Sequence, residues 1–232
     1  MSEQTNFLND SKKLTYTAEV DGSTMNMNYL LFTPDGYEKM EPLPIILFLH
    51  DNGETWSDGT SDTEILQKLI DNDKFPCIIL APKSNRNWCD WQPATIANKL
   101  TKEIMSTYNC DPDRFYIMGF GMGAFAIYDF IGHTTDNGGI AGAVTIGGAY
   151  MFELIENIKN VPLWIFYGDS DYNVEKYSKR MVAELEKVRG NKYKSTDYTG
   201  ADNEIDFIYF RNIFFMQHFK SEAHIIYSFT RH

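Results

Sequence analysis

The sequence has few cysteines and an excess of negative charge. Its 232 residues include three cysteines, an odd number without the spacing of a metal site, so we expect free thiols rather than a disulfide framework. Neither a metal nor a cofactor is predicted. Asp and Glu number 32 against 21 Lys and Arg, and the formal net charge of −11 opposes binding to a polyphosphate backbone. We therefore expect no nucleic-acid partner.

Long apolar runs are also missing. No stretch approaches the roughly 20 apolar residues that a membrane-spanning helix needs, and residues 1–13 lack the apolar core of a secretory signal. We expect residues 1–13 to be a flexible segment, and the protein to be cytoplasmic with no membrane partner. A chain from which a signal had been removed would give the same pattern.

The composition indicates one domain, over residues 1–232. Hydrophobic residues make up 43% and aromatic residues 15%, which is enough for one substantial core. Two β-rich runs around Asp21-Gly22-Ser23 predict a hairpin. Later strands are expected at residues 42–50, 77–81, 114–118, 140–146, 162–167 and 193–198. Helices are expected at residues 65–70, 94–108, 125–131, 151–158 and 174–188 and from about 205. This alternation predicts an α/β fold with a doubly wound, mainly parallel sheet of about eight strands and helices on both faces.

The segment Arg114–Ala124, RFYIMGFGMGA, predicts a strand, a tight turn and a helix. Glycines at 119 and 123 allow close packing of helix and strand, and Gly121 can adopt a backbone conformation that is costly for other residues. A glycine-rich turn before a helix can also present N–H groups to a phosphate. Nucleotide binding at Gly119–Gly123 is therefore an alternative, although the spacing is not G-x-G-x-x-G.

This segment resembles the G-x-S-x-G turn of α/β-hydrolases, which lifts a catalytic serine above the sheet. Three stretches resemble bacterial esterases related to feruloyl esterases, polyhydroxyalkanoate depolymerases and dienelactone hydrolases. They are PLPIILFLHDNGE (Pro42–Glu54), YNCDPDRFYIMGFGMGAFAIYDF (Tyr108–Phe130) and VPLWIFYGDSDYNV (Val161–Val174). The similarity covers roughly residues 14–219. It implies the α/β-hydrolase fold and ester hydrolysis by a serine, a histidine and an acid.

The resemblance also locates the catalytic positions, and most of them are substituted. The nucleophile position falls on Gly121, the acid position on Asp171 and the base position on Asn203. Asp171 can equally be a turn residue that caps the next helix. The oxyanion-hole region corresponds to Asp51, Asn52 and Met122. Asp51 replaces a glycine there, and its carboxylate would repel an oxyanion if it pointed inward.

Aromatic residues follow several of the predicted strands. Each one can serve packing or recognition, but together they would form a stacking surface for a sugar or a phenolic ring. The candidates for ligand binding are Trp56, Trp88, Trp91 and Tyr150.

These substitutions favour an esterase-like homologue that has lost hydrolysis and keeps a pocket for a carbohydrate, a phenolic ester or a partner. The first alternative is an active carboxylesterase or carbohydrate esterase, such as a feruloyl esterase, that uses residues the resemblance does not identify. His218 or His224 could supply a base, but neither restores a nucleophile. Nucleotide binding is the second alternative. The sequence does not indicate an oligomeric state.

Overall fold

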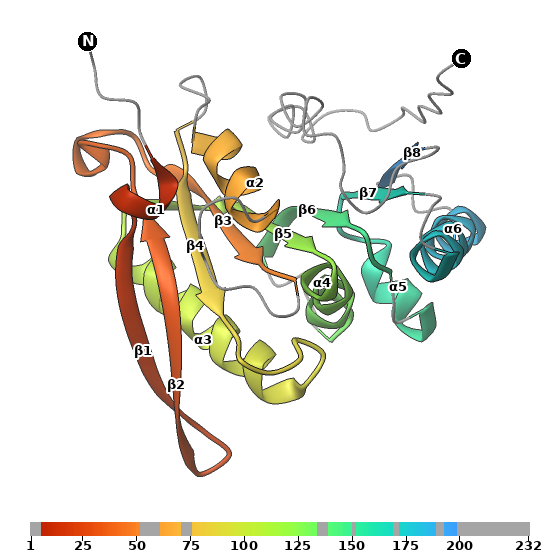
Figure 1. Ribbon diagram of the computed structural model, residues 1–232, viewed down its shortest axis with the longest axis horizontal. Coiled ribbons are helices and arrows are strands. Elements are labelled where there is room, and N and C mark those ends of the chain that lie inside the picture. The colour runs from red at the N-terminus through yellow and green to blue at the C-terminus, as the bar shows by residue number, and fades with distance from the viewer. Residues whose placement is uncertain are drawn as a thin grey trace.

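The computed structural model describes residues 6–51, 61–70, 76–133, 139–149, 152–168, 172–188 and 193–198. Within these ranges eight strands form one sheet (Figure 1). They are β1 (Lys12–Val20), β2 (Ser23–Phe32), β3 (Leu43–Leu49), β4 (Ile78–Lys83), β5 (Cys110–Phe120), β6 (Ile140–Ile146), β7 (Leu163–Gly168) and β8 (Tyr193–Tyr198). Their order across the sheet is β1-β2-β4-β3-β5-β6-β7-β8.

The sheet is antiparallel at one side and parallel elsewhere. Strands β1 and β2 form the predicted hairpin, which the pair Val20 and Ser23 closes around Asp21 and Gly22. Both turn residues have positive φ angles, 48° and 72°, as a tight hairpin turn requires. Strand β2 pairs antiparallel with β4, and from β4 to β8 each neighbouring pair is parallel. The prediction of a mainly parallel, doubly wound sheet is confirmed.

Strand β3 is covered on both faces. All seven of its residues are buried, and alternate side chains of a strand point to opposite faces. Ile45, Leu47 and Leu49 belong to one apolar cluster, whereas Ile46 and Phe48 belong to another. The continuous apolar run in the sequence therefore corresponds to a central strand with a core on each side.

Helices contribute to both of these cores. The cluster that contains Ile46 and Phe48 also takes residues from α1 (Phe7–Asp10) and α2 (Ser61–Ile70). The other cluster takes residues from α3 (Trp91–Thr107), α4 (Met122–Gly132), α5 (Ile155–Ile158) and α6 (Tyr172–Lys187). Two short 3₁₀ helices are η1 (Tyr37–Lys39) and η3 (Phe152–Leu154). None of the described helices is long and apolar enough to cross a membrane.

Strand β5 starts earlier than the sequence predicts. It begins at Cys110, ahead of the turn signal Asp111-Pro112-Asp113, and its register against β3 shifts between Leu43 and Ile45. The turn signal therefore lies in an irregular part of the strand, as in a β-bulge. The Asp113 N–H donates to Asp111 Oδ1 at 2.9 Å, a local bond typical of aspartate turns. The predicted turn chemistry is present, but it does not end the strand.

The N-terminal segment differs from the flexible stretch expected over residues 1–13. Residues 7–10 form α1, and β1 has already begun at Lys12. Phe7 is only 1% exposed and packs near the Phe32 ring, with centroids 6.2 Å apart. Its N–H donates to Gln67 Oε1 of α2 at 2.8 Å. Phe7 is therefore held by β2 and α2, which are distant in sequence. The helix predicted from residue 205 lies outside the described residues.

Candidate functional site

The carboxyl ends of β3 and β5 bring His50, Asp51 and Gly121 to one edge of the sheet. Strand β3 leads into His50 and Asp51, and the neighbouring β5 leads into Gly121. Strands β7 and β8 end at Gly168 and Tyr198, ahead of the stretches that contain Asp171 and Asn203. Sites of open α/β sheets form at this edge. Several candidates lie outside the described residues, namely Asn52, Trp56, Tyr150, Asp171, Asn203, His218 and His224.

Gly121 alone connects β5 to α4, so the predicted strand, turn and helix are confirmed. Its backbone angles are φ 51° and ψ −116°, a combination that residues other than glycine adopt only with strain. The Gly121 N–H donates to the Ile146 carbonyl of β6 at 2.9 Å, and the Phe125 N–H donates to the Gly121 carbonyl at 3.2 Å. The turn is therefore fixed on one side by the sheet and on the other by the first turn of α4.

Helix α4 approaches the end of β3 very closely. A Cβ atom at Gly123 would overlap the carbonyl oxygen of Leu49. Glycine at this position lets the start of the helix lie directly against the strand end. The residues that follow β3 are thereby brought beside the turn at Gly121.

The carboxyl group of Asp51 fills the space beside that turn. A Cβ atom built on Gly121 would lie within 2.5 Å of all three atoms of this carboxyl group. The Met122 N–H, the first of α4, donates to Asp51 Oδ1 at 2.7 Å. A carboxylate is favoured there because the unpaired N–H groups at a helix N-terminus carry partial positive charge. With Asp51 in this position there is no room for a side chain at residue 121, so the Asp51 carboxylate would have to move to accommodate one.

His50 fixes the backbone next to Asp51. The histidine is 2% exposed and its ring meets the edge of Trp88, with centroids 5.1 Å apart. The Ser84 N–H donates to His50 Nε2 at 3.0 Å, so Nε2 must accept and Nδ1 carries the proton. His50 Nδ1 then donates to the Asp51 carbonyl at 2.5 Å. Both ring nitrogens are engaged, so the neutral His50 links β3 to the segment after β4.

The two tryptophans that the sequence proposes for ligand binding have different surroundings. Trp88 is 1% exposed and belongs to the core, so it serves packing in this structure. Its Nε1 has no hydrogen-bond partner among the described residues. Trp91, the first residue of α3, is 49% exposed and presents its ring at the surface. Only Trp91 of this pair is available to a ligand.

Cysteine chemistry does not replace the missing serine in the described part of the chain. Burial raises the pKa of the Cys89 thiol to about 11, and the charges of Asp129 and Asp90 add to the effect. Burial likewise raises the pKa of Cys77 to about 12 and that of Cys110 to about 11. A thiol with such a pKa stays protonated at neutral pH and is a poor nucleophile. Among the described residues, no group of three or more His, Cys, Asp and Glu could hold a metal ion.

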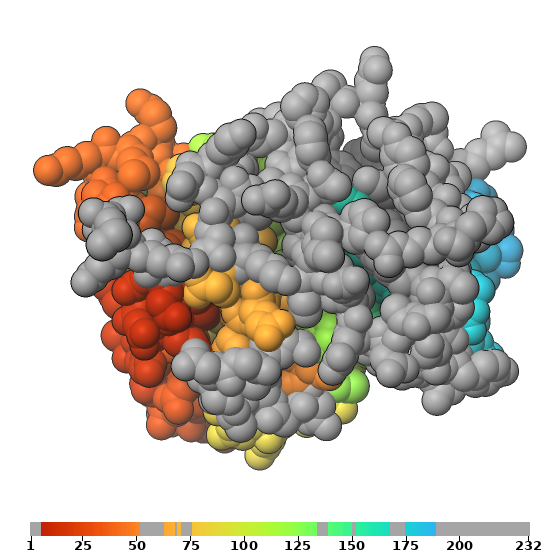
Figure 2. Space-filling model, turned by 45° about the horizontal axis from the view of Figure 1, so that its top comes forward, coloured from red at the N-terminus to blue at the C-terminus, as the bar shows by residue number. Residues whose placement is uncertain are grey.

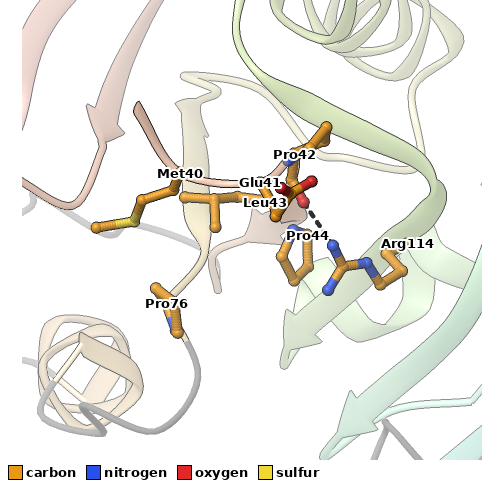
Figure 3. A pocket seen from close by; sticks show the side chains of 7 residues that line it. All are labelled: Met40, Glu41, Pro42, Leu43, Pro44, Pro76 and Arg114. Carbon is orange, nitrogen blue, oxygen red and sulfur yellow. Dashed lines mark hydrogen bonds between the residues drawn. The ribbon is translucent and has the colours of Figure 1, made fainter. Parts of the chain in front are cut away.

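A groove of about 410 Å³ lies at the amino end of β3, away from the glycine turn (Figure 3). It is lined by Met40, Glu41, Pro42, Leu43, Pro44, Pro76 and Arg114. The Arg114 guanidinium is already bonded to the Asp111 carboxylate and the Pro42 carbonyl. The groove therefore offers mainly apolar surface, and the candidate site remains the edge that contains Gly121 and Asp51.

The sequence identifies Asp51 and Gly121 as two separate departures from the esterase pattern. It misses their complementarity, which only the contact between them reveals. The sequence contains one indication of this contact: an acidic residue, Asp51, follows β3 in the same chain that has glycine at position 121.

The overlap between Asp51 and residue 121 can be measured by a double-mutant cycle. Gly121→Ser should lower the free energy of unfolding by about 1–3 kcal/mol through backbone strain, plus the cost of displacing Asp51. In an Asp51→Gly background the same substitution should cost at least about 1 kcal/mol less. Gly139→Ser is the control, because Gly139 also has a positive φ but no neighbour within 4 Å. Equal costs of Gly121→Ser in both backgrounds, measured by urea denaturation, would contradict the overlap.

No family model matches the sequence, and no curated protein matches it. Solved esterases are similar in structure. A thermostable esterase superimposes with a TM-score of 0.69 at 21% identity, over 93% of this chain and 61% of its own. A ferulic acid esterase gives 0.63 at 13% identity, over 90% and 96%. A feruloyl esterase module from Clostridium thermocellum, complexed with sinapinate, gives 0.60 at 15% identity, over 84% of each chain.

This chain thus spans less than two thirds of the thermostable esterase. At these identities the likeness is one of fold. It agrees with the strand order of the sheet and with the strand, turn and helix at Gly121. The chain therefore has the α/β-hydrolase fold that these esterases share.

Proposed function

We propose that this chain is an esterase-like α/β-hydrolase homologue that does not hydrolyse esters by the serine mechanism. The observation that carries the proposal is the position of Asp51, whose carboxylate takes the space of a side chain at residue 121 and the N–H of Met122. In serine hydrolases of this fold the residue at the turn attacks the carbonyl. The N–H of the next residue then stabilises the oxyanion. Asp51 occupies both places.

The groups at the positions that the resemblance identifies do not support the steps of the serine reaction. Gly121 has no side-chain oxygen that could attack a carbonyl. An oxyanion at the Met122 N–H would meet the negative charge of Asp51, which would raise the free energy of the transition state. His50 cannot accept a proton from a nucleophile, because both of its ring nitrogens are engaged. Asn203, at the position of the base, has no basic nitrogen.

The same edge of the sheet is proposed to bind a small phenolic or sugar ligand, or a partner. Trp91 supports this proposal, because its half-exposed ring at the start of α3 offers a face for stacking. Two of the structural relatives are ferulic acid or feruloyl esterases, and one of them is complexed with sinapinate. A hydroxycinnamate is therefore the first ligand class to test.

The position of Asp51 argues against nucleotide binding at Gly119–Gly123, which the sequence leaves as an alternative. A phosphate would need the N–H groups at the start of α4, and the carboxylate of Asp51 already accepts from Met122. Two negative groups at one helix terminus would repel each other.

Restoring the lost groups should restore hydrolysis. The wild-type protein should neither turn over p-nitrophenyl acetate nor react with a fluorophosphonate. The variant Gly121→Ser/Asp51→Gly/Asn203→His should gain ester turnover and fluorophosphonate labelling. Its three substitutions supply a nucleophile, remove the carboxylate that overlaps the nucleophile and supply a base. The matched variant Gly121→Ser/Asn203→His, which keeps Asp51, should be about 100-fold slower, because the Asp51 carboxylate competes with the new side chain for its place and leaves a negative charge beside the oxyanion donor. Wild-type turnover that survives repurification would contradict the proposal and favour an active esterase.

Ligand binding is tested separately from hydrolysis. Ferulate and xylo-oligosaccharides are titrated by calorimetry against the wild type and Trp91→Ala. If Trp91 stacks on the ligand, its loss should weaken binding by roughly three- to tenfold. Met40→Ala removes an exposed apolar side chain from the groove at the amino end of β3 and should leave the affinity unchanged. Binding that depends on Met40 but not on Trp91 would place the ligand in that groove instead.

A further inference from the structure

Strand β1 forms an outer edge of the sheet and is regular along its whole length. It is the first strand in the sheet order, and Figure 1 shows it along one side of the molecule. Figure 2 shows the hairpin surface, in red and orange, on that side. Its nine residues contain neither proline nor glycine, and all of them pair with β2 without a register shift. Natural proteins often interrupt an edge strand with a proline or a β-bulge, because a long regular edge can pair with another strand.

The outward backbone groups of β1 follow from the hairpin geometry. Val20 and Ser23 flank a two-residue turn, so they exchange hydrogen bonds, and every second residue of β1 does the same. The intervening residues direct their N–H and C=O groups away from β2; they are Lys13, Thr15, Thr17 and Glu19. Lys99 Nζ of α3 donates to the Glu19 carbonyl at 2.5 Å, which agrees with this direction. A carbonyl oxygen has two lone pairs, so that of Glu19 can accept from a second donor as well. In the described part of the chain, no other strand pairs with β1.

We propose that a second copy of this chain pairs with β1 in antiparallel orientation and continues the sheet. The strand KKLTYTAEV is complementary to itself when Tyr16 lies opposite the partner's Tyr16. In this register Lys13 lies opposite the partner's Glu19, and Thr15 lies opposite the partner's Thr17. Two-fold symmetry repeats both contacts, so the interface contains two pairs of opposite charge. Cross-strand pairs of opposite charge stabilise an antiparallel ladder, and like charges destabilise it.

Charge and hydrogen bonding together select this register. Shifting it by one residue would place outward-directed backbone groups opposite inward-directed ones, which breaks the ladder. Shifting it by two residues keeps the ladder but moves Lys13 away from the partner's Glu19. Lys13 and Glu19 are both exposed, on the face that also carries Thr15 and Thr17. On the other face Leu14, which is 37% exposed, would lie opposite the partner's Ala18 and become covered.

One ladder of nine residues buries little area, so the association should be weak, with a dissociation constant on the order of micromolar. Because the pairs of Lys13 with the partner's Glu19 are electrostatic and exposed to solvent, the association should weaken further at high salt. The net charge of −11 on each copy opposes association. The local pairs of Lys13 with the partner's Glu19 are therefore what would make it specific.

Sedimentation equilibrium of the full chain at low salt tests this interface by charge exchange. The wild type should dimerise. Lys13→Glu alone and Glu19→Lys alone should each raise the dissociation constant roughly tenfold, since two pairs change to like charges. An equimolar mixture of the two variants should recover wild-type affinity, because both pairs are then opposite in charge. Within one chain the two residues are about 20 Å apart along the strand, so such recovery can only come from contact between copies.

The controls distinguish the effect of the specific charge pairs on dimerisation from the effect of net charge. Glu19→Lys changes the net charge of each copy from −11 to −9, so general repulsion alone predicts stronger association, opposite to our expectation. Lys39→Glu makes the same charge change as Lys13→Glu at an exposed position outside β1 and should leave the dimer intact. A monomeric wild type at about 100 times the expected micromolar constant would overturn the proposal. Failure of the mixture to associate better than either variant would overturn it too.

Discussion

The hydrogen bond from the Met122 N–H to the Asp51 carboxylate holds this side chain beside the turn at Gly121, at the carboxyl edge of the sheet. It satisfies the first N–H of α4 and places a negative charge where the helix terminus favours one. The same carboxyl group overlaps the position of any side chain at residue 121. One contact therefore stabilises the start of the helix and fills the space next to residue 121.

The surrounding fold keeps this contact in place. The neutral His50 connects the Asp51 carbonyl to the Ser84 N–H, which joins the ends of β3 and β4. The close approach of Gly123 to Leu49 brings α4 against β3. Gly121 itself has backbone angles that would strain a serine. The tight turn between β5 and α4 thus has glycine at its centre, and the same turn determines how α4 packs on the sheet.

Much of this could be predicted from local pattern. The continuous apolar run of β3, the Asp21-Gly22 hairpin and the glycine-rich turn each depend on neighbouring residues, and the structure confirms all three. Other features depend on distant contacts. Phe7 is buried only because β2 and α2 receive it. Trp88 looks like a loop residue in the sequence, but it packs in the core against His50. The position of the Asp51 side chain depends on a strand and a helix about 70 residues apart, so no local pattern could reveal it.

The most direct test of the account is amide hydrogen exchange at Met122, measured by NMR in the wild type and in Asp51→Gly. The Phe125 N–H, which donates to the Gly121 carbonyl in the same turn of helix, is the internal reference for any change in overall stability. We predict that the Met122 N–H exchanges slowly in the wild type, and that removing the carboxylate accelerates its exchange at least about tenfold relative to Phe125. Equal relative exchange in the two proteins would contradict the claim that Asp51 occupies this donor.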